Sequence, residues 1–515
     1  MRSGGRCVKG KGVDYYLVEM DRIDFELGKE QLMKNGYLIL VAAFGLIAGP
    51  ALSQDAKAVL QKASEALGAA NLNSIQFSGT GHISALGQNL LPNSPWPETT
   101  ITSYTRTVDY ANKSSREELT RVQNNPPSKG GGAPFGGEQK QVNIVSGQYA
   151  WNQPGAQPQP APAAAEERQL QIWLTPQGFI KGALENNATA KKGKGGTEVT
   201  FTAMNKYKIA GTIDNQGMVT KVDTWIANPV VGDMLIESRY SDYKDFGGVK
   251  FPTKIVQDQG GHPVLDLTVS DVKANAASAA LNVPDNVKAA KIPPVRVETQ
   301  NLGDGAWWLG GGSHHSVVVE FKDYIAVVET PLTEERAEAV LAEARKLVPN
   351  KPIKYVINSH HHWDHSGGLR AVVAEGIPII TQEQNKSFYE QAWKNPHTLE
   401  PDKLAKNPKK PTFITFKDKY VLTDGNQTLE LHYITGNDHN GDMILGYLPK
   451  QKVLIEADLF TPGPPNGPPP VPLALSFTNE LYDNLQRLHL DVVTIAPLHG
   501  RVVPYSDMLK VLGKA

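Results

Sequence analysis

The chain has 515 residues, of which 40% are hydrophobic and 20% are charged, and its formal net charge at pH 7 is -1. This composition is ordinary for a globular protein and excludes a mainly disordered chain. Because the charges balance, we expect no nucleic-acid partner. The length exceeds what one hydrophobic core usually organises, so two domains are expected.

A secretory signal pattern begins at Met33, where the sequence reads MKNGYLILVAAFGLIAGPALSQ. A short basic start, an apolar run and small residues follow one another in the order typical of a cleaved signal peptide. We predict a signal peptide over residues 33–53, cleavage before Gln54 and a periplasmic or secreted protein. The apolar run is short for a membrane span, so no stable membrane insertion is expected once the signal is removed.

The segment before the signal, residues 1–32, has no targeting pattern and is predicted to be a non-native upstream extension. The alternative is a short cytoplasmic tail before an uncleaved anchor. The single cysteine, Cys7, lies in this segment. The mature chain would therefore have no disulfide, no thiolate metal ligand and no cysteine nucleophile.

Residues 54–290 are predicted to form an antiparallel, β-rich accessory domain. Apolar residues at helical spacing predict an amphipathic helix over Asp55–Leu67, and from about Ser74 the pattern changes to the two-residue alternation of strands. Two stretches rich in Pro, Gly and Ala, residues 124–139 and 153–167, are expected to be exposed loops.

This order of a helix followed by a meander resembles the lipoprotein-carrier type of half-barrel found in exported bacterial proteins. The alternative is an accessory domain with no ligand of its own. The periodic pattern weakens in a segment with several prolines and glycines. A domain boundary is therefore expected near residues 285–300.

Residues 300–515 are predicted to form a second domain, in which strands alternate with helices. The pattern begins with strands over 306–321 and 324–331, followed by a helix at 334–348 and a strand at 352–359. Two sheets enclosed by helices would satisfy this order. The whole chain is therefore expected to be of the α+β class.

A cluster of side chains that can bind metals follows the apolar strand of the second domain, in the sequence SHHHWDHSGG at 359–368. The candidate ligands within it are His360, His362, Asp364 and His365. On an extended segment, His360 and His362 point to the same side and could bind one ion, while the other two could reach a second ion. A surface histidine tract or an expression tag is the alternative, but this run is interior and follows a strand of buried type.

The His-x-His-x-Asp-His arrangement after a strand resembles the central motif of the metallo-β-lactamase superfamily. The resemblance covers roughly residues 300–515 and implies a four-layer αββα fold for this domain. Three later residues match the ligand pattern of the family in order: His439 in TGNDHNGD, Asp458 at the end of KVLIEAD and His499 in APLHG.

The resemblance implies how these residues share two metal ions. One ion would be held by His360, His362 and His439. The other would be held by Asp364, His365 and His499. Asp458 would bridge the two ions, which we expect to be divalent and to be Zn²⁺, because imidazole and carboxylate suit that metal.

The function implied by the resemblance is that of an exported binuclear metal-dependent hydrolase. A hydroxide bridging the two ions would attack an ester, lactone, thioester or related bond in a small-molecule substrate, and Asp364 would orient it. Zinc β-lactamases place cysteine or serine where this chain has Asp458. A bridging aspartate instead resembles the glyoxalase-II, lactonase and phosphodiesterase branches.

Three alternatives stay open. The protein could be a β-lactamase, a mononuclear iron enzyme similar to the persulfide dioxygenases, or a non-catalytic carrier of an apolar ligand in its N-terminal domain. His314 and His315, in a glycine-rich turn, could border the site or pack elsewhere. The insertion from Gln382 to Lys410 could be a lid over the metals or a solvated helical excursion. The sequence does not indicate an oligomeric state.

Overall fold

The computed structural model describes residues 49–276, 281–465, 467 and 470–515. The predicted upstream extension, and the part of the predicted signal peptide before Gly49, lie outside the described residues. No helix among the described residues is both long enough and apolar enough to cross a membrane. Gly49–Ala515 pack as one compact unit.

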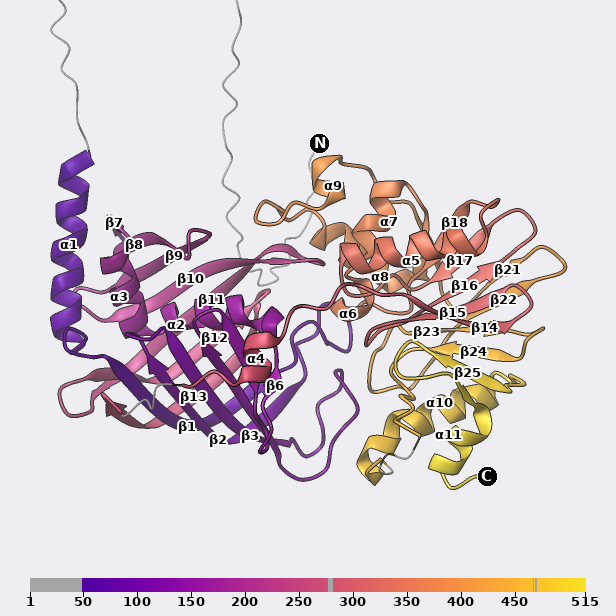
Figure 1. Cartoon of the computed structure of the whole chain (residues 1–515), viewed down its shortest axis with the longest axis horizontal. Coiled ribbons are helices and arrows are strands. Elements are labelled where there is room, and N and C mark those ends of the chain that lie inside the picture. The colour runs from indigo at the N-terminus through magenta and orange to yellow at the C-terminus, as the bar shows by residue number, and fades with distance from the viewer. Residues whose placement is uncertain (1–48, 277–280, 466, 468–469) are drawn as a thin grey trace, which may run out of the picture. The chain divides into compact units, whose positions relative to one another are not determined.

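The N-terminal half is built on one 13-stranded antiparallel sheet, as the alternating pattern predicts. Helix α1 (Gly49–Ala66) precedes it and confirms the predicted amphipathic helix. The strands are β1 (Ser74–Ser84), β2 (Glu98–Asp109), β3 (Ser114–Gln123), β4 (Gln139–Ser146), β5 (Tyr149–Asn152), β6 (Gln159–Pro160), β7 (Thr189–Gly193), β8 (Gly196–Ala203), β9 (Tyr207–Ile213), β10 (Val219–Asn228), β11 (Gly232–Asp245), β12 (Lys250–Gln259) and β13 (His262–Ala274). The first and last strands, β1 and β13, are neighbours at the centre of the sheet (Figure 1).

Two helices, α2 (Ala165–Trp173) and α3 (Pro176–Glu185), pack with the sheet in a shared hydrophobic core. The prediction of a loop over 153–167 is therefore wrong at its end, because a short helix, η1 (Pro162–Ala164), and the start of α2 lie within it. The two glutamates of the first turn of α2 favour a helix start there, which the alanine-rich composition concealed. Thr175 caps α3 by accepting a hydrogen bond from the Gly178 backbone.

The C-terminal half contains two mixed sheets with helices, which confirms the predicted αββα architecture. The first sheet contains β14 (Glu298–Gly303), β15 (Ala306–Gly310), β16 (Ser316–Glu320), β17 (Ile325–Val328), β18 (Ile353–Ile357), β19 (Ile379–Gln382) and β20 (Phe413–Phe416). The second contains β21 (Lys419–Thr423), β22 (Thr428–Tyr433), β23 (Ile444–Leu448), β24 (Val453–Glu456), β25 (Thr494–Pro497) and β26 (Val503–Pro504). The helices are α5 (Glu334–Leu347), α6 (Trp363–Ser366), α7 (Leu369–Glu375), α8 (Glu383–Ala392), α9 (Lys403–Lys406), η2 (Pro472–Leu475), α10 (Ser476–Arg487) and α11 (Tyr505–Val511).

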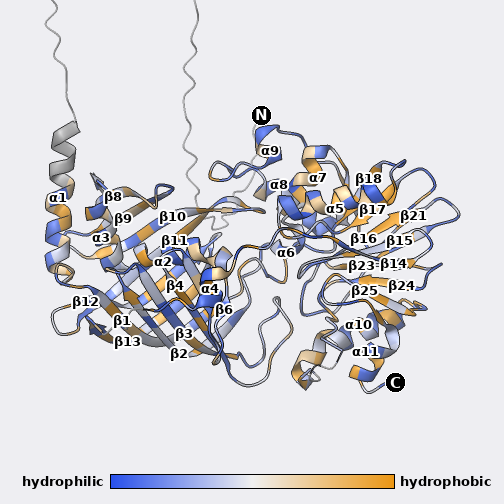
Figure 2. Cartoon of the chain, in the orientation of Figure 1, coloured by the Kyte–Doolittle hydropathy of each residue, from blue (hydrophilic) through white to orange (hydrophobic). Residues whose placement is uncertain are grey.

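The layers of this half are set by strands that are apolar on both faces. On β17, Ile325 and Val327 pack in the core that includes α5 and α7, whereas Ala326 and Val328 pack in the core between the sheets. Figure 1 shows α5 and α7 on one side of the paired sheets and α10 and α11 on the other. Figure 2 shows the apolar colouring of the inner strands β23, β24 and β25. Burial on both faces leaves the loops at the strand ends as the place for polar chemistry.

The limits predicted for the domains stay predictions, since the two halves pack within one unit. A short helix, α4 (Asp285–Ala289), lies in the segment where the boundary is expected.

We expect Gly211→Ala, on β9, to destabilise the protein. A methyl group there would lie 2.4 Å from the ring of the fully buried Phe179, and such overpacking costs about 1–3 kcal/mol. Urea unfolding measures the loss in free energy of unfolding. Gly195→Ala is the control, because a Cβ there meets no atom within 4 Å; equal stability of both variants would contradict the packing described for α3 and β9.

Candidate metal centre

The histidine-rich motif lies on an irregular segment between β18 and α6. β18 is hydrogen-bonded between the parallel strands β17 and β19, and the chain leaves the sheet after Ile357. The Asn358 side chain donates to the His360 carbonyl at 2.8 Å, and the Ser366 hydroxyl donates to the His362 carbonyl at 2.9 Å. These bonds fix the backbone from which the motif's side chains project.

The three histidines predicted for the first ion come together. One ring nitrogen from each of His360, His362 and His439 lies within 4.8 Å of the others. His362 Nε2 lies 2.9 Å from the Asn89 carbonyl, and His439 Nδ1 lies 2.5 Å from the Gly131 carbonyl. Because a carbonyl only accepts, these nitrogens carry the protons, and the lone pairs of His362 Nδ1 and His439 Nε2 are left for a metal.

An orphaned atom supports this interpretation. His362 Nδ1 is buried and has no hydrogen-bond partner. A buried polar atom without a partner is costly, and a metal ion at this position would satisfy it. His360 Nε2 and His439 Nε2 face each other at 3.4 Å. The donor set therefore fits a divalent ion bound by three imidazoles.

The residues predicted for the second ion also come together. Ligand atoms of Asp364, His365 and His499 form one cluster, together with His314. His365 Nδ1 lies 2.7 Å from a carboxylate oxygen of Glu329, while the Nε2 atoms of His365 and His499 lie 3.0 Å apart. Two imidazole nitrogens at this distance need a proton or a metal ion between them.

The Asp458 carboxylate lies between the two clusters. Its Oδ2 is 2.9 Å from His365 Nε2, 3.5 Å from His439 Nε2 and 3.7 Å from His360 Nε2. Its Oδ1 is 3.0 Å from His499 Nε2. One carboxylate in reach of both clusters is the arrangement that a bridging ligand requires.

The protonation states of most ligands at the centre suit metal binding. Burial lowers the pKa of His360 and of His362 well below the usual value, so both are neutral. Burial raises the pKa of Asp458, but the neighbouring histidines, His365 first, outweigh it and hold the pKa well below its usual value. The pKa of Asp364 is also lowered, because His365 and His314 outweigh its burial. Neutral imidazoles and ionised carboxylates are the forms that bind metals. His365 differs, because burial lowers its pKa but Asp458 and Asp364 raise it overall, so a metal ion would replace its proton.

Access to the centre is one-sided. The side chains of His360 and His439 are 0% and 1% exposed, whereas those of Asp364, Asp458 and His499 are 30%, 17% and 16% exposed. A substrate would therefore approach from the side of the second cluster.

The structure separates the two histidines of the glycine-rich turn. His314 Nε2 lies 3.0 Å from Asp364 Oδ2, and the His314 backbone forms a bridge with that of His499. His315 instead packs on Trp308, with ring centroids 4.3 Å apart, and burial lowers its pKa to about 4. His314 thus borders the site and His315 does not, a difference that their adjacent places in the sequence could not reveal.

Glu329 is a supporting residue that the sequence interpretation missed. It is fully buried at the end of β17, where its carboxylate accepts from the Ser359 backbone at 2.9 Å and from the Ser359 hydroxyl at 2.7 Å, besides contacting His365. Glu329 and Asp458 both have left-handed backbone, with φ of 70° and 64°. Non-glycine residues rarely adopt this region, and such strain is typical of functional sites. A carboxylate ending an apolar strand was the available signal.

Loops of the N-terminal sheet domain reach the centre. The Gln88 amide donates to Asp364 Oδ1 at 2.8 Å. Asn89 contributes its carbonyl to His362 and its side-chain oxygen to His361 Nε2 at 3.0 Å, and Gly131 contributes its carbonyl to His439. The predicted accessory domain therefore forms part of the surroundings of the metal ligands.

The insertion at 382–410 contains α8 and α9. Tyr389 on α8 is fully buried, and its hydroxyl donates to the Asn358 side chain at 2.6 Å. This contact gives α8 a supporting role beneath the segment that carries the motif.

Comparison with known proteins identifies the class. Residues 309–500 match the family described as the Metallo-beta-lactamase superfamily. The C-terminal half of the chain is therefore a domain of the metallo-β-lactamase superfamily, with His/Asp clusters compatible with a binuclear metal site.

Individual relatives match this chain over a short stretch or at low identity. The chain is 43% identical over 58 residues to a linear primary-alkylsulfatase from a Pseudomonas species, a match spanning 11% of this chain and 9% of that protein. Among solved structures, a metallo-beta-lactamase from Pontibacter korlensis is 22% identical, with 42% of this chain and 98% of that chain covered and a TM-score of 0.32. The metallo-beta-lactamase FIM-1 from Pseudomonas aeruginosa, in its mono-zinc form, is 18% identical, with 43% and 96% covered and a TM-score of 0.33.

We expect Asn89→Ala to weaken metal binding, although Asn89 touches no metal itself. Its amide donates to the carbonyls of Pro92 and Ser94 at 3.0 and 3.2 Å, which holds the loop whose carbonyl orients His362. Loss of such outer contacts lowers metal affinity by about tenfold or more. Competition against a chromophoric zinc chelator measures the affinity. Asn426→Ala, at an exposed turn, is the control, and the same affinity in both variants would show that the sheet domain does not support the centre.

Proposed function

We propose that this protein is a binuclear metal-dependent hydrolase that acts on an ester, lactone, thioester or related bond of a small molecule. The observation that carries the proposal is the position of the Asp458 carboxylate, within reach of His365 and His499 on one side and His360 and His439 on the other. The superfamily match over 309–500 supports it.

The residues of the centre are assigned to two metal ions. His360, His362 and His439 would hold one ion, Asp364, His365 and His499 the other, and Asp458 would bridge them. When bound, two divalent ions would lower the pKa of water toward neutrality and polarise the bond to be broken.

Asp364 is the proposed catalytic residue, and its orientation is fixed from two sides. Gln88 donates to Oδ1 and the His314 ring lies against Oδ2. A carboxylate held in this way, at the exposed side of the centre, can orient an attacking water molecule toward the substrate. His314 and Gln88 are then positioning residues.

We propose zinc as the metal, because imidazole predominates in both clusters. The proposed location is the periplasm or the outside of the cell, on the signal pattern at 33–53, and the proposed partner is a small-molecule substrate.

A second candidate activity is the hydrolysis of a sulfate ester of a primary alcohol. It is favoured by the 43% identity to a linear primary-alkylsulfatase, over 58 residues. A sulfate ester has the anionic character that a site built around two cations would attract, and its hydrolysis uses the same centre.

Metal analysis tests the centre itself. We expect about two zinc-like ions per chain, and we expect Asp458→Asn to lower that number and to reduce hydrolysis by at least about a hundredfold. Elemental analysis of the purified protein measures the stoichiometry, with the exposed Asp271→Asn variant as control. One iron per chain would instead favour the persulfide-dioxygenase type of enzyme.

A substrate panel tests the reaction. We expect turnover of at least one among a lactone, a thioester, an aryl acetate, a phosphodiester and dodecyl sulfate, and little turnover of the β-lactam nitrocefin. Asp364→Ala should abolish this turnover, because the substituted side chain can neither bind a metal nor orient water. Exclusive hydrolysis of nitrocefin would identify a β-lactamase. Activity unchanged by Asp364→Ala would show that the metal centre takes no part in the reaction.

A further inference from the structure

The N-terminal sheet domain contains a hollow of its own, apart from the metal centre. A cavity of about 400 Å³ lies between α2 and the inner face of β1 to β4 and β11 to β13. Cavities of this size hold small organic ligands. The hollow is not fully enclosed, so a ligand can enter it from solvent.

One wall of the hollow is apolar. It is formed by side chains that belong to the core of the domain: Phe77, Leu174, Tyr240, Ile255 and Leu267. This wall would bury the hydrocarbon part of a ligand.

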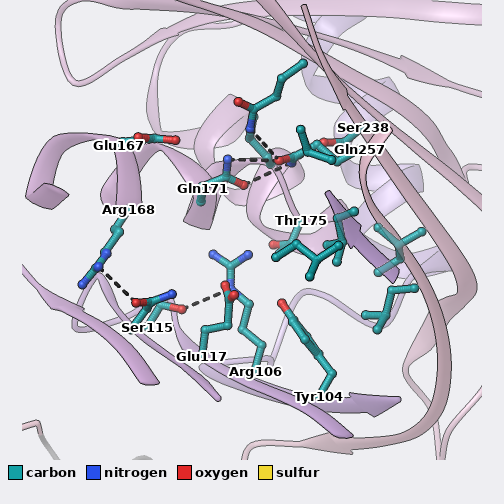
Figure 3. A pocket seen from close by; sticks show the side chains of 18 of the residues that line it. Tyr104, Arg106, Ser115, Glu117, Glu167, Arg168, Gln171, Thr175, Ser238 and Gln257 are labelled. Carbon is teal, nitrogen blue, oxygen red and sulfur yellow. Dashed lines mark hydrogen bonds between the residues drawn. The ribbon is translucent and has the colours of Figure 1, made fainter. Parts of the chain in front are cut away.

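The other wall carries polar side chains at strand positions that face inward, where alternation would place apolar residues. Arg106 on β2 and Glu117 on β3 extend from neighbouring strands into the same space, opposite Gln171 and Gln257 (Figure 3). Gln257 donates to Ser238 at 2.9 Å and to Gln171 at 3.2 Å. The two amides therefore satisfy each other's hydrogen-bonding groups, whereas Arg106 and Glu117 form no direct ion pair.

Arg106 is a buried cation whose cross-strand neighbour, Glu117, forms no direct ion pair with it. The residue is only 9% exposed, and Nε donates to the Ser115 hydroxyl at 3.2 Å. Arg106 also interacts with the Tyr104 hydroxyl, which Glu117 contacts as well, and electrostatically with Tyr110 and Tyr240. Within the described part of the chain, neither Arg106 nor Glu117 forms an ion pair at an N···O distance of 4.0 Å or less. A buried guanidinium in this state is stabilised by an anion.

The neighbouring Arg168 shows the contrast. Its guanidinium donates to the carbonyls of Ile144 and Trp151 and to the side chains of Asn143 and Asn152, at 2.6–3.1 Å. Arg168 is a structural residue tying α2 to the sheet, and Arg106 is the cation left for a ligand.

We propose that this hollow binds a small organic anion with an apolar body, with the anionic group against Arg106 and the hydrocarbon against the Phe77 and Leu267 wall. Glu117 and Glu167 also line the hollow, so the anion lies on the Arg106 side and the carboxylates set its orientation. The proposal does not rest on the hydrolase activity, since none of these residues belongs to the metal centre.

Three probes with the same chain test the charge preference: decanoate, decanol and decyltrimethylammonium, each below the concentration at which it self-associates. Calorimetric titration of the mature protein should show one site that binds decanoate about tenfold more tightly than decanol, the size of one charge-assisted hydrogen bond. The ammonium probe should bind most weakly. Chelation of the metals should leave decanoate binding unchanged, which separates the hollow from the metal centre.

Variants assign the effect to residues. Arg106→Gln should remove the preference for decanoate over decanol while decanol binding persists, which shows that the hollow is intact. Glu117→Gln should strengthen decanoate binding, because it removes a repelling charge. Arg116→Gln is the matched control, since Arg116 pairs with Glu118 at 2.8 Å and does not line the hollow.

The contrary outcomes are distinct. Decanoate binding no tighter than decanol, or unaffected by Arg106→Gln, would overturn the proposal. Tightest binding of the ammonium probe would make the hollow a site for cations at Glu117. Loss of decanoate binding on chelation would place that probe at the metal centre and equally overturn the proposal.

Discussion

The convergence of imidazole nitrogens on the Asp458 carboxylate is the constraint on which the rest of the structure depends. Lone pairs and a carboxylate held this close repel one another unless a cation lies among them. Neutral His360 and His362, an ionised Asp458 between the two clusters and an orphaned His362 Nδ1 all fit a site that binds metal ions. The strained backbone at Asp458 is one local cost of that preparation.

The two-sheet fold brings these residues together, because most of them lie directly after a strand. The motif follows β18, Glu329 follows β17, Asp458 follows β24 and His499 follows β25. These strands pack in the hydrophobic core, which fixes their positions. The polar side chains directly after them are therefore held in place as well. Contacts from Glu329 to His365 and from backbone carbonyls to His362 and His439 determine which ring nitrogen of these histidines would face a metal ion.

Two loops of the N-terminal domain contact the centre, and one of them also lines the hollow. Ile83, Ser84 and Leu86 line the hollow of the sheet domain, and Gln88 and Asn89, two and three residues after Leu86, contact Asp364 and the motif histidines. A ligand in the hollow would therefore rest against the same loop that orients Asp364. This continuity would connect a ligand in the hollow to the position of Asp364.

The sequence by itself determined the class of the C-terminal fold and the candidate ligands. Metal binding requires particular side chains, here placed after strands, and unbroken apolar runs indicate where those strands are. It also predicted the antiparallel sheet from alternation, although the start of α2 was hidden in an alanine- and proline-rich stretch. The assignment of His314 but not His315 to the site, the support from Glu329 and the approach of Gln88, Asn89 and Gly131 were decided only by the tertiary structure. These depend on contacts between residues up to 308 positions apart, and no local pattern encodes which distant loop will meet a given histidine.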